Sequence, residues 1–299
     1  MMRDYQAEFG KRVAFIRSLV AEAHVKGIVY GNSGGKDSAL VGILCKAACP
    51  DTVGIILPCA SQRNFGSDMD DGRAVAVQFD IETRMVDLTG VRAEMLRALE
   101  DQSALTDAAI ANIAPRLRMT ALYAVAGAEN RLVAGTGNRS ERYMGYFTKW
   151  GDGACDFNPI SDLTVGEIYE FLEFLHAPRS IIEKAPSAGL FEGQTDEQEM
   201  GVSYAAIDEY LLHGVASDRD KAIIEGYHAR AGHKLHLPTV YREIYRPRAL
   251  HSGASARGAN ACIFRGSSFP RKIRFAGFLR GGGHIFPLRP AEGRDIIPL

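Results

Sequence analysis

The stretch GIVYGNSGGKDS, residues 27–38, decides the fold of this chain of 299 residues. It opens with a short apolar run, 27–30, which is typical of a buried strand. A turn rich in glycine and serine follows, and from Ser38 to Ala48 apolar residues recur at helical spacing. A strand, a glycine-rich turn and a helix in immediate succession indicate one unit of an α/β sheet.

The same alternation continues on both sides of this stretch. Helices are predicted before it over 14–24 and far after it over 165–175. The segments between them are predicted to be strand or helix in the order 52–57, 70–79, 84–88, 91–99, 106–129 (a helix broken only at Pro115) and 132–134. This order predicts a doubly wound, mainly parallel sheet flanked by helices. Ligands bind at the carboxyl ends of strands in such sheets, so we expect the chemistry in the loops after Tyr30, Leu57 and Ala134.

The loop that follows the first strand is suited to holding phosphate. Its glycines let the backbone approach an anion, its serine hydroxyls add donors, and the next helix presents its positive end. The loop consists of Gly31, Asn32, Ser33, Gly34, Gly35, Lys36, Asp37 and Ser38. A Walker loop would place Ser or Thr after its lysine, so the γ-phosphate chemistry of kinases and GTPases is not indicated. A carboxylate beside phosphate calls for a cation, which makes Asp37 a candidate Mg²⁺ ligand; the alternative is a helix-capping Asp37 after a flexible turn.

A second constellation follows the strand over 132–134. Residues 135–160 read GTGNRSERYMGYFTKWGDGACDFNPI, a mixture of glycines, charges and aromatic rings that plain surface loops rarely have. Glu141 can give the metal a second carboxylate, and Thr136 and Lys149 can donate to phosphate or carboxylate oxygens. Lys36 and Lys149 would act by charge, and no residue stands out as a nucleophile. The alternative is a solvated loop in which Glu141 begins a helix.

Charge divides the chain into two predicted domains, 1–243 and 244–299. The second contains ten Lys or Arg residues and two acids, whereas the first contains 25 and 34. We expect the second to be a poorly ordered basic extension, with contact to nucleic acid or a polyphosphate as the alternative. The chain has no apolar run of membrane length and no apolar leader near Met1, so a cytoplasmic location is expected. The cysteines are expected to be reduced thiols: Cys45, Cys49, Cys59, Cys155 and Cys262.

Two motifs carry a resemblance to known families. Residues 33–38 resemble the S-G-G-x-D-S signature of the PP-loop ATP pyrophosphatases, which have an adenine nucleotide alpha hydrolase-like fold and split ATP into AMP and pyrophosphate. From about Arg12 to Pro238 the chain is similar to bacterial ammonia-dependent NAD synthetases. The shared features are GTGN-x-SE-x-x-x-GYFTK-x-GDG over 135–153, RLRM over 116–119, PISDL over 159–163, TDE over 195–197, GVSY over 201–204 and His233-Lys234.

The resemblance implies amidation of deamido-NAD by ammonia, driven by ATP through an acyl adenylate, with NAD, AMP and pyrophosphate as products. It implies Mg²⁺ held by Asp37 and Glu141, and a homodimer with residues 116–123 near the interface. ATP would contact residues 31–38, Thr136, Ser187 and the position of Val165. Deamido-NAD would contact Arg116, Lys149, Asp156, His233 and Lys234.

Three features depart from the family pattern. Val165 stands where the family usually has an ATP-contacting lysine, and Ser187 stands where threonine is common. After LHLP at 235–238 the chain continues for more than fifty residues that match nothing in the pattern. Two alternatives follow: a tRNA-modifying PP-loop enzyme with Cys59 or Cys155 as sulfur carrier, and a catalytically inactive nucleotide-binding module. We expect neither nucleic acid nor a membrane among the partners.

Overall fold

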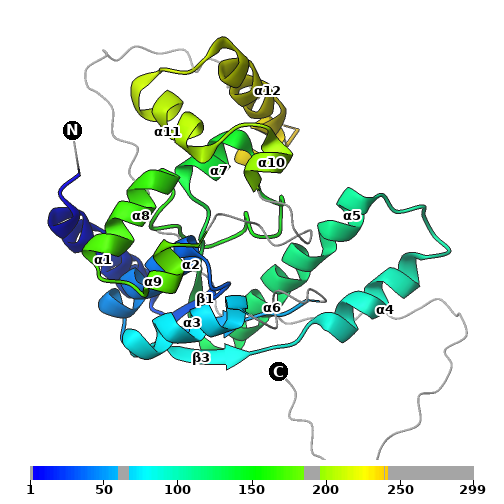
Figure 1. Ribbon diagram of the computed structural model, residues 1–299. Coiled ribbons are helices and arrows are strands. Elements are labelled where there is room, and N and C mark those ends of the chain that lie inside the picture. The colour runs from blue at the N-terminus through cyan, green and yellow to red at the C-terminus, as the bar shows by residue number, and fades with distance from the viewer. Residues whose placement is uncertain (1–2, 60–66, 185–195, 239, 242–299) are drawn as a thin grey trace, which may run out of the picture. The chain divides into compact units, whose positions relative to one another are not determined.

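The computed structural model describes residues 3–59, 67–184, 196–238 and 240–241 (Figure 1). All of them belong to one compact unit, Met1–Tyr241. The predicted second domain, 244–299, lies outside the described residues.

Four parallel strands in the described residues form one sheet in the order β3-β2-β1-β4. They are β1 (Gly27–Gly31), β2 (Thr52–Ile56), β3 (Glu82–Met85) and β4 (Arg131–Ala134). The chain runs outward from β1 to β3 and then returns to place β4 on the other side of β1. The carboxyl ends of the neighbouring strands β1 and β4 therefore form a topological switch point, where ligands bind in sheets of this kind. The predicted doubly wound parallel sheet is confirmed.

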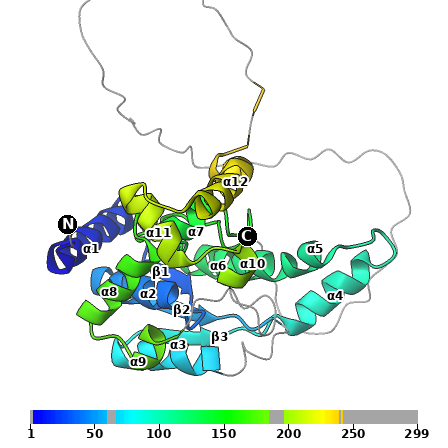
Figure 2. The same cartoon turned by 45° about the horizontal axis from the view of Figure 1, so that its top comes forward.

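Helices cover both faces of the sheet and gather beside one end of it (Figures 1 and 2). They are α1 (Tyr5–Ala23), α2 (Lys36–Ala48), α3 (Ser67–Gln78), α4 (Thr89–Leu99), α5 (Asp107–Ala111), α6 (Ile113–Glu129), α7 (Arg139–Met144), α8 (Val165–Phe174), α9 (Arg179–Ile182), α10 (Asp196–Met200), α11 (Tyr204–His213) and α12 (Asp218–Leu235). Residues of α1, α2, α3, α8 and α9 share one core cluster with Ile28 and Tyr30. The other face, with Val29 and Val53, packs on α6. A third cluster joins α7, α8, α10, α11 and α12.

The helix predicted over 106–129 is broken at a different place from the one expected. The structure has α5 and α6 separated at Asn112, and Pro115 lies inside the first turn of α6. The first-turn amides of a helix have no intrahelical acceptor, so a proline there removes no helical hydrogen bond. The predicted break at Pro115 is therefore wrong.

The end strand β3 also differs from its prediction. It spans Glu82–Met85, whereas the expected strand began at Arg84 and ended at Leu88. β3 is an outer strand of the described sheet, and its residues are exposed or half-buried. Its sequence therefore lacks the apolar pattern of a buried strand, by which its ends could have been predicted.

Two expectations from composition can be compared with the described residues. Of the five cysteines, the four in this part of the chain are free thiols. None of the helices described is long and apolar enough to span a bilayer.

Candidate active site

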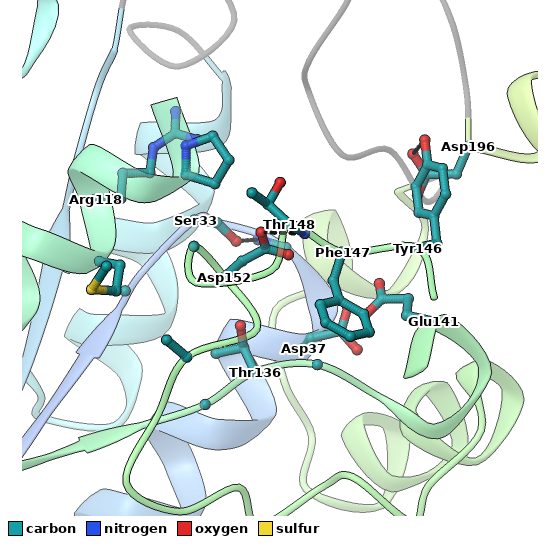
Figure 3. Close-up of a pocket in the computed structure, with 18 of the residues that line it drawn as sticks. Ser33, Asp37, Arg118, Thr136, Glu141, Tyr146, Phe147, Thr148, Asp152 and Asp196 are labelled. Atoms are coloured by element: carbon teal, nitrogen blue, oxygen red, sulfur yellow. Dashed lines mark hydrogen bonds between the residues drawn. The ribbon is translucent and has the colours of Figure 1, made fainter. Parts of the chain in front are cut away.

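A cavity of about 710 Å³ opens where β1, β2 and β4 end. The loops after these three strands line it, and most of the rest of its lining comes from helices, chiefly α6, α7 and the end of α12, with single residues or pairs from α3, α5, α8 and α10. Figure 3 shows Asp37 and Glu141 near each other, with Arg118 toward one end of the pocket and Asp196 toward the other. A volume of this size suits a ligand as large as a nucleotide.

The phosphate loop is shaped by its glycines and by α3. Gly34 has a φ of +71°, a conformation that favours glycine. A side chain there would also overlap the backbone carbonyl of Asp68 in α3. Gly35 is the N-cap of α2 and makes no side-chain capping bond, so the first amides of α2 have no capping side chain. Such amides, at the positive end of a thirteen-residue helix, are suited to bind an anion.

Lys36 and Asp37 lie in the first turn of α2, and Asp37 does not cap the helix. The Lys36 ammonium is 2.8 Å from Oδ2 of Asp37, and its side chain is buried. Burial acts to lower the pKa of Lys36, but the charges of Asp37 and Glu141 outweigh burial and raise it. Lys36 therefore remains a cation inside the site.

Glu141 is brought to Asp37 by the local structure of α7. Asn138 caps this helix in a capping box, in which its side chain accepts from the Glu141 amide and the Glu141 carboxylate accepts from the Asn138 amide. The Asn138 side-chain amide also donates to Oδ1 of Asp37 over 3.0 Å. The predicted pair of carboxylates, from sequence positions about a hundred residues apart, is thus connected through one asparagine.

Electrostatics at this pair favour a divalent cation. Desolvation by the surrounding protein and then the charge of Asp37 raise the pKa of Glu141 to about 8, against the opposing effect of Lys36. Two carboxylates that repel each other beside a phosphate loop fit Mg²⁺, which usually takes one or two carboxylates and completes its coordination with phosphates and water. The donor set is all oxygen, as a hard cation requires.

Comparison with known proteins identifies the family to which this chain belongs. The model of the NAD synthase family matches residues 8–237. The chain belongs to the NAD synthase family. A curated NH(3)-dependent NAD(+) synthetase of Carboxydothermus hydrogenoformans is 43% identical over 243 residues, which cover 80% of this chain and 99% of the relative. As a member of this family the chain is a ligase, and the family uses ATP as a substrate.

Solved structures of NAD synthase relatives share the fold. An NMN synthetase from Francisella tularensis matches with a TM-score of 0.76 and 35% identity, covering 81% of this chain and all of that one. An NH3-dependent NAD synthetase from Campylobacter jejuni, in complex with nitrate, matches with a TM-score of 0.64 and 28% identity, covering 80% of this chain and all of that one.

Most of the residues predicted to bind ligands line this same cavity. They are Gly31, Asn32, Ser33, Gly35, Lys36, Asp37, Thr136, Glu141, His233 and Lys234. Gly34 and Ser38 instead shape the loop, since the Ser38 hydroxyl donates to the Gly35 carbonyl. Ser187 lies outside the described residues. Binding by these residues stays a prediction.

Four other predicted residues do not line the cavity. Val165 is buried in the cluster with α11 and α12. Asp156 accepts from the Val133 amide over 2.8 Å and from the Tyr123 hydroxyl over 3.2 Å. Arg116 is exposed and donates to the Lys149 carbonyl, while the Lys149 ammonium is 2.6 Å from the carbonyl of His233. In this structure Lys149 therefore connects the second constellation to the end of α12.

The sequence assigned no role to several charged residues that line the cavity, among them Lys184, Arg118 and Asp196. The Lys184 ammonium contacts the Gly34 carbonyl and pairs with Asp68 and Asp71 at 2.7 and 2.6 Å. It thus adds a cation beside the phosphate loop, although position 165 has no lysine. No spacing rule links positions 34 and 184, so only the folded chain reveals the contact.

Proposed function

We propose that this chain is an ammonia-dependent NAD+ synthetase that amidates deamido-NAD at the expense of ATP. The observation that supports it most directly is that Asn138 links Asp37 of the phosphate loop to Glu141 in a chain of the NAD synthase family. The substrates suit the cavity because two anionic nucleotides must meet there, and its wall supplies amides, a buried lysine and two carboxylates suited to a cation.

The reaction follows from the weakness of a carboxylate as an electrophile. One oxygen of the substrate carboxylate attacks the α-phosphorus of ATP, the bond to the β-phosphate oxygen breaks, and pyrophosphate leaves. Ammonia then attacks the acyl carbon, AMP leaves with the activating oxygen, and a proton is lost to give the amide. Neither step needs a protein nucleophile.

The protein would act mainly by positioning and by offsetting charge. Loop amides and Lys36 would bind the phosphates, with Lys184 beside them. Asp37 and Glu141 would hold Mg²⁺, which when bound supplies neutralisation of phosphate charge. Thr136, in the loop after β4, would donate to phosphate from the opposite side of the switch point.

A second substrate calls for a direct test because one of the solved relatives is an NMN synthetase. Nicotinate mononucleotide carries the same carboxylate as deamido-NAD and differs by lacking the adenylate half. The same chemistry would convert it to NMN. The 43% identity to a curated NAD+ synthetase favours the dinucleotide.

The thiols provide little support for a sulfur-transferring tRNA enzyme. Burial raises the pKa of Cys59, and burial also raises the pKa of Cys155. A sulfur carrier needs a thiolate with a lowered pKa and access to solvent.

The test is a stoichiometric assay with the full chain. ATP, Mg²⁺ and ammonium would be incubated with deamido-NAD or, separately, with nicotinate mononucleotide, and the amide product and AMP would be quantified. We expect equal amounts of NAD and AMP, and neither from Asp37→Ala. Asp80→Ala is the control, because Asp80 is fully exposed at the opposite end of the sheet.

Three other results would contradict part or all of the proposal. Faster amidation of the mononucleotide would replace the proposed substrate. Glutamine that supports turnover as well as ammonium does would refute free ammonia as the nitrogen source. AMP formation that depends on added tRNA and not on deamido-NAD would refute the proposal as a whole.

A further inference from the structure

Asn138 makes contacts that a helix cap does not require. Its side chain is completely buried at the start of α7. Oδ1 accepts from the Glu141 amide over 2.9 Å, and Nδ2 donates to Oδ1 of Asp37 over 3.0 Å. Its backbone amide donates to Oε2 of Glu141 over 3.2 Å. One residue therefore contacts both candidate metal ligands, each by a separate hydrogen bond.

The capping function accounts for only part of these contacts. A cap needs an acceptor for the N3 amide, which Ser, Thr and Asp provide as well as Asn. The same chain shows this at α8, where Thr164 forms an equivalent buried capping box with Glu167. The donor on Asn138 is the additional feature, and it is directed to a carboxylate 101 positions away in the sequence.

Only a carboxamide offers an acceptor and a fixed donor at this length. An aspartate would face Asp37 with a second charge, and a hydroxyl is too short to serve both partners. With the Lys36 ammonium on Oδ2 and the Asn138 amide on Oδ1, both oxygens of Asp37 are held in place. Each oxygen keeps a lone pair for a cation.

We propose that Asn138 is a positioning residue that orients Asp37 and Glu141 so that both can bind one divalent cation. This inference rests on the proposed function, which places the cation between these two carboxylates. Partners that orient metal ligands typically account for about 10- to 100-fold in metal affinity.

The test measures metal binding directly, without turnover. Mn²⁺ would be titrated into the full-length protein with a non-hydrolysable ATP analogue, and free Mn²⁺ would be counted by electron paramagnetic resonance. Asn138→Ser keeps a capping acceptor, but its hydroxyl is too short to reach Asp37 as the Asn138 amide does, so we expect Mn²⁺ binding to weaken about 10-fold or more. Asn138→Thr is the second variant, since threonine already caps α8 in this fold.

Thr164→Ala is the matched control. It removes an equally buried N-cap of a capping box that has no contact with Asp37, so its melting temperature should fall while its Mn²⁺ affinity stays that of the wild type. In the turnover assay, Asn138→Ser should need about 10-fold more Mg²⁺ and should approach wild-type kcat when Mg²⁺ saturates.

Two results would overturn the proposal. Wild-type Mn²⁺ affinity in both Asn138 variants would reduce the residue to a helix cap. Equal Mn²⁺ binding by the wild type and Asp37→Ala would remove the cation from this pair altogether. A failure of the proposed function is recognised separately, because it would appear as absent NAD formation by a wild-type protein that still binds Mn²⁺ through Asp37.

Discussion

Tyr30 is an unusual residue for the centre of a sheet. Its side chain is completely buried on β1, and its hydroxyl has no hydrogen-bond partner among the described residues. The ring lies over Gly42 of α2 and Gly54 of β2, and a side chain at either glycine would overlap it. These two glycines are therefore needed for space, because a larger residue would collide with the ring.

The Tyr30 contact predicts a coupled pair of substitutions. Gly42→Ala should lower the free energy of unfolding by about 2 kcal/mol, because the added methyl overpacks against the Tyr30 hydroxyl. Tyr30→Phe alone should cost little, since the hydroxyl it removes is unsatisfied. The double variant should recover part of the loss. Urea unfolding of all four proteins measures the coupling, and strict additivity would show that the two residues do not press on each other.

Among the contacts between elements, Arg12 binds α1 to the segment that precedes α8. Its guanidinium contacts both oxygens of Asp162 at 2.6 and 2.8 Å and Oε2 of Glu8 at 2.9 Å. It also donates to the Pro159 carbonyl. Burial acts to raise the pKa of Asp162 and Glu8, but the hydrogen bonds and charge of Arg12, with Lys11 on Glu8, outweigh burial and lower both values.

These shifts predict a pH-dependent stability. A carboxyl whose pKa is lower in the folded state stabilises the fold above its unfolded pKa, which is about 4, and the gain is lost as pH falls through the lower folded value. Arg12→Met should therefore reduce the free energy of unfolding by about 2 kcal/mol near neutral pH, a modest figure because Asp162 is half exposed. The difference from the wild type should shrink between about pH 5 and pH 3 in urea unfolding. An equal difference at both ends would mean that Arg12 acts by packing alone.

The elements that sequence could predict are those whose signals are local. The apolar core of β1 and β2 and the helical spacing of α2 and α8 follow from periodicity, and the observed ends of these elements lie within two residues of the predicted ones. The signals fail where context decides, at the break before α6 and along β3. The prediction missed the first nine residues of the nineteen-residue helix α1, although Tyr5, Phe9 and Val13, which pack into the core, recur at helical spacing.

The topology of the whole molecule explains which residues of the site could be predicted from the sequence. Loops at the carboxyl ends of parallel strands must meet, so the order of strands and loops in the sequence already places the phosphate loop, Thr136 and Glu141 together. It does not place Lys184, Arg118 and Asp196, because their approach to the cavity depends on the tertiary packing of α6, α9 and α10. Arg116 and Asp156 are of residue types that commonly bind ligands. In the described structure, however, Arg116 is exposed and donates to the Lys149 carbonyl, and Asp156 accepts from the Val133 amide of β4.

The arrangement of α4 bears on the expected homodimer. None of its described residues is buried, and Val91 and Met95 are 51% and 42% exposed. Exposed apolar residues on a helix beside α6 suit an isologous contact with a second copy. We expect a dimer in sedimentation velocity at micromolar concentration, and Met95→Glu should shift it toward monomer. A monomeric wild-type protein would refute the expectation.

Removing residues 242–299 tests the division of the chain. The curated relative aligns over 99% of its own length with only 80% of this chain, and the family model ends at residue 237. All predicted ligand-binding residues precede residue 235, so the truncated chain 1–241 should keep kcat/KM for deamido-NAD within about twofold, and its unfolding midpoint should be unchanged. The segment's eleven basic residues supply a second readout. Any affinity they have for polyanions should weaken with salt in the full chain and be lost on truncation. A tenfold loss of kcat/KM would instead assign part of the active site to the basic segment.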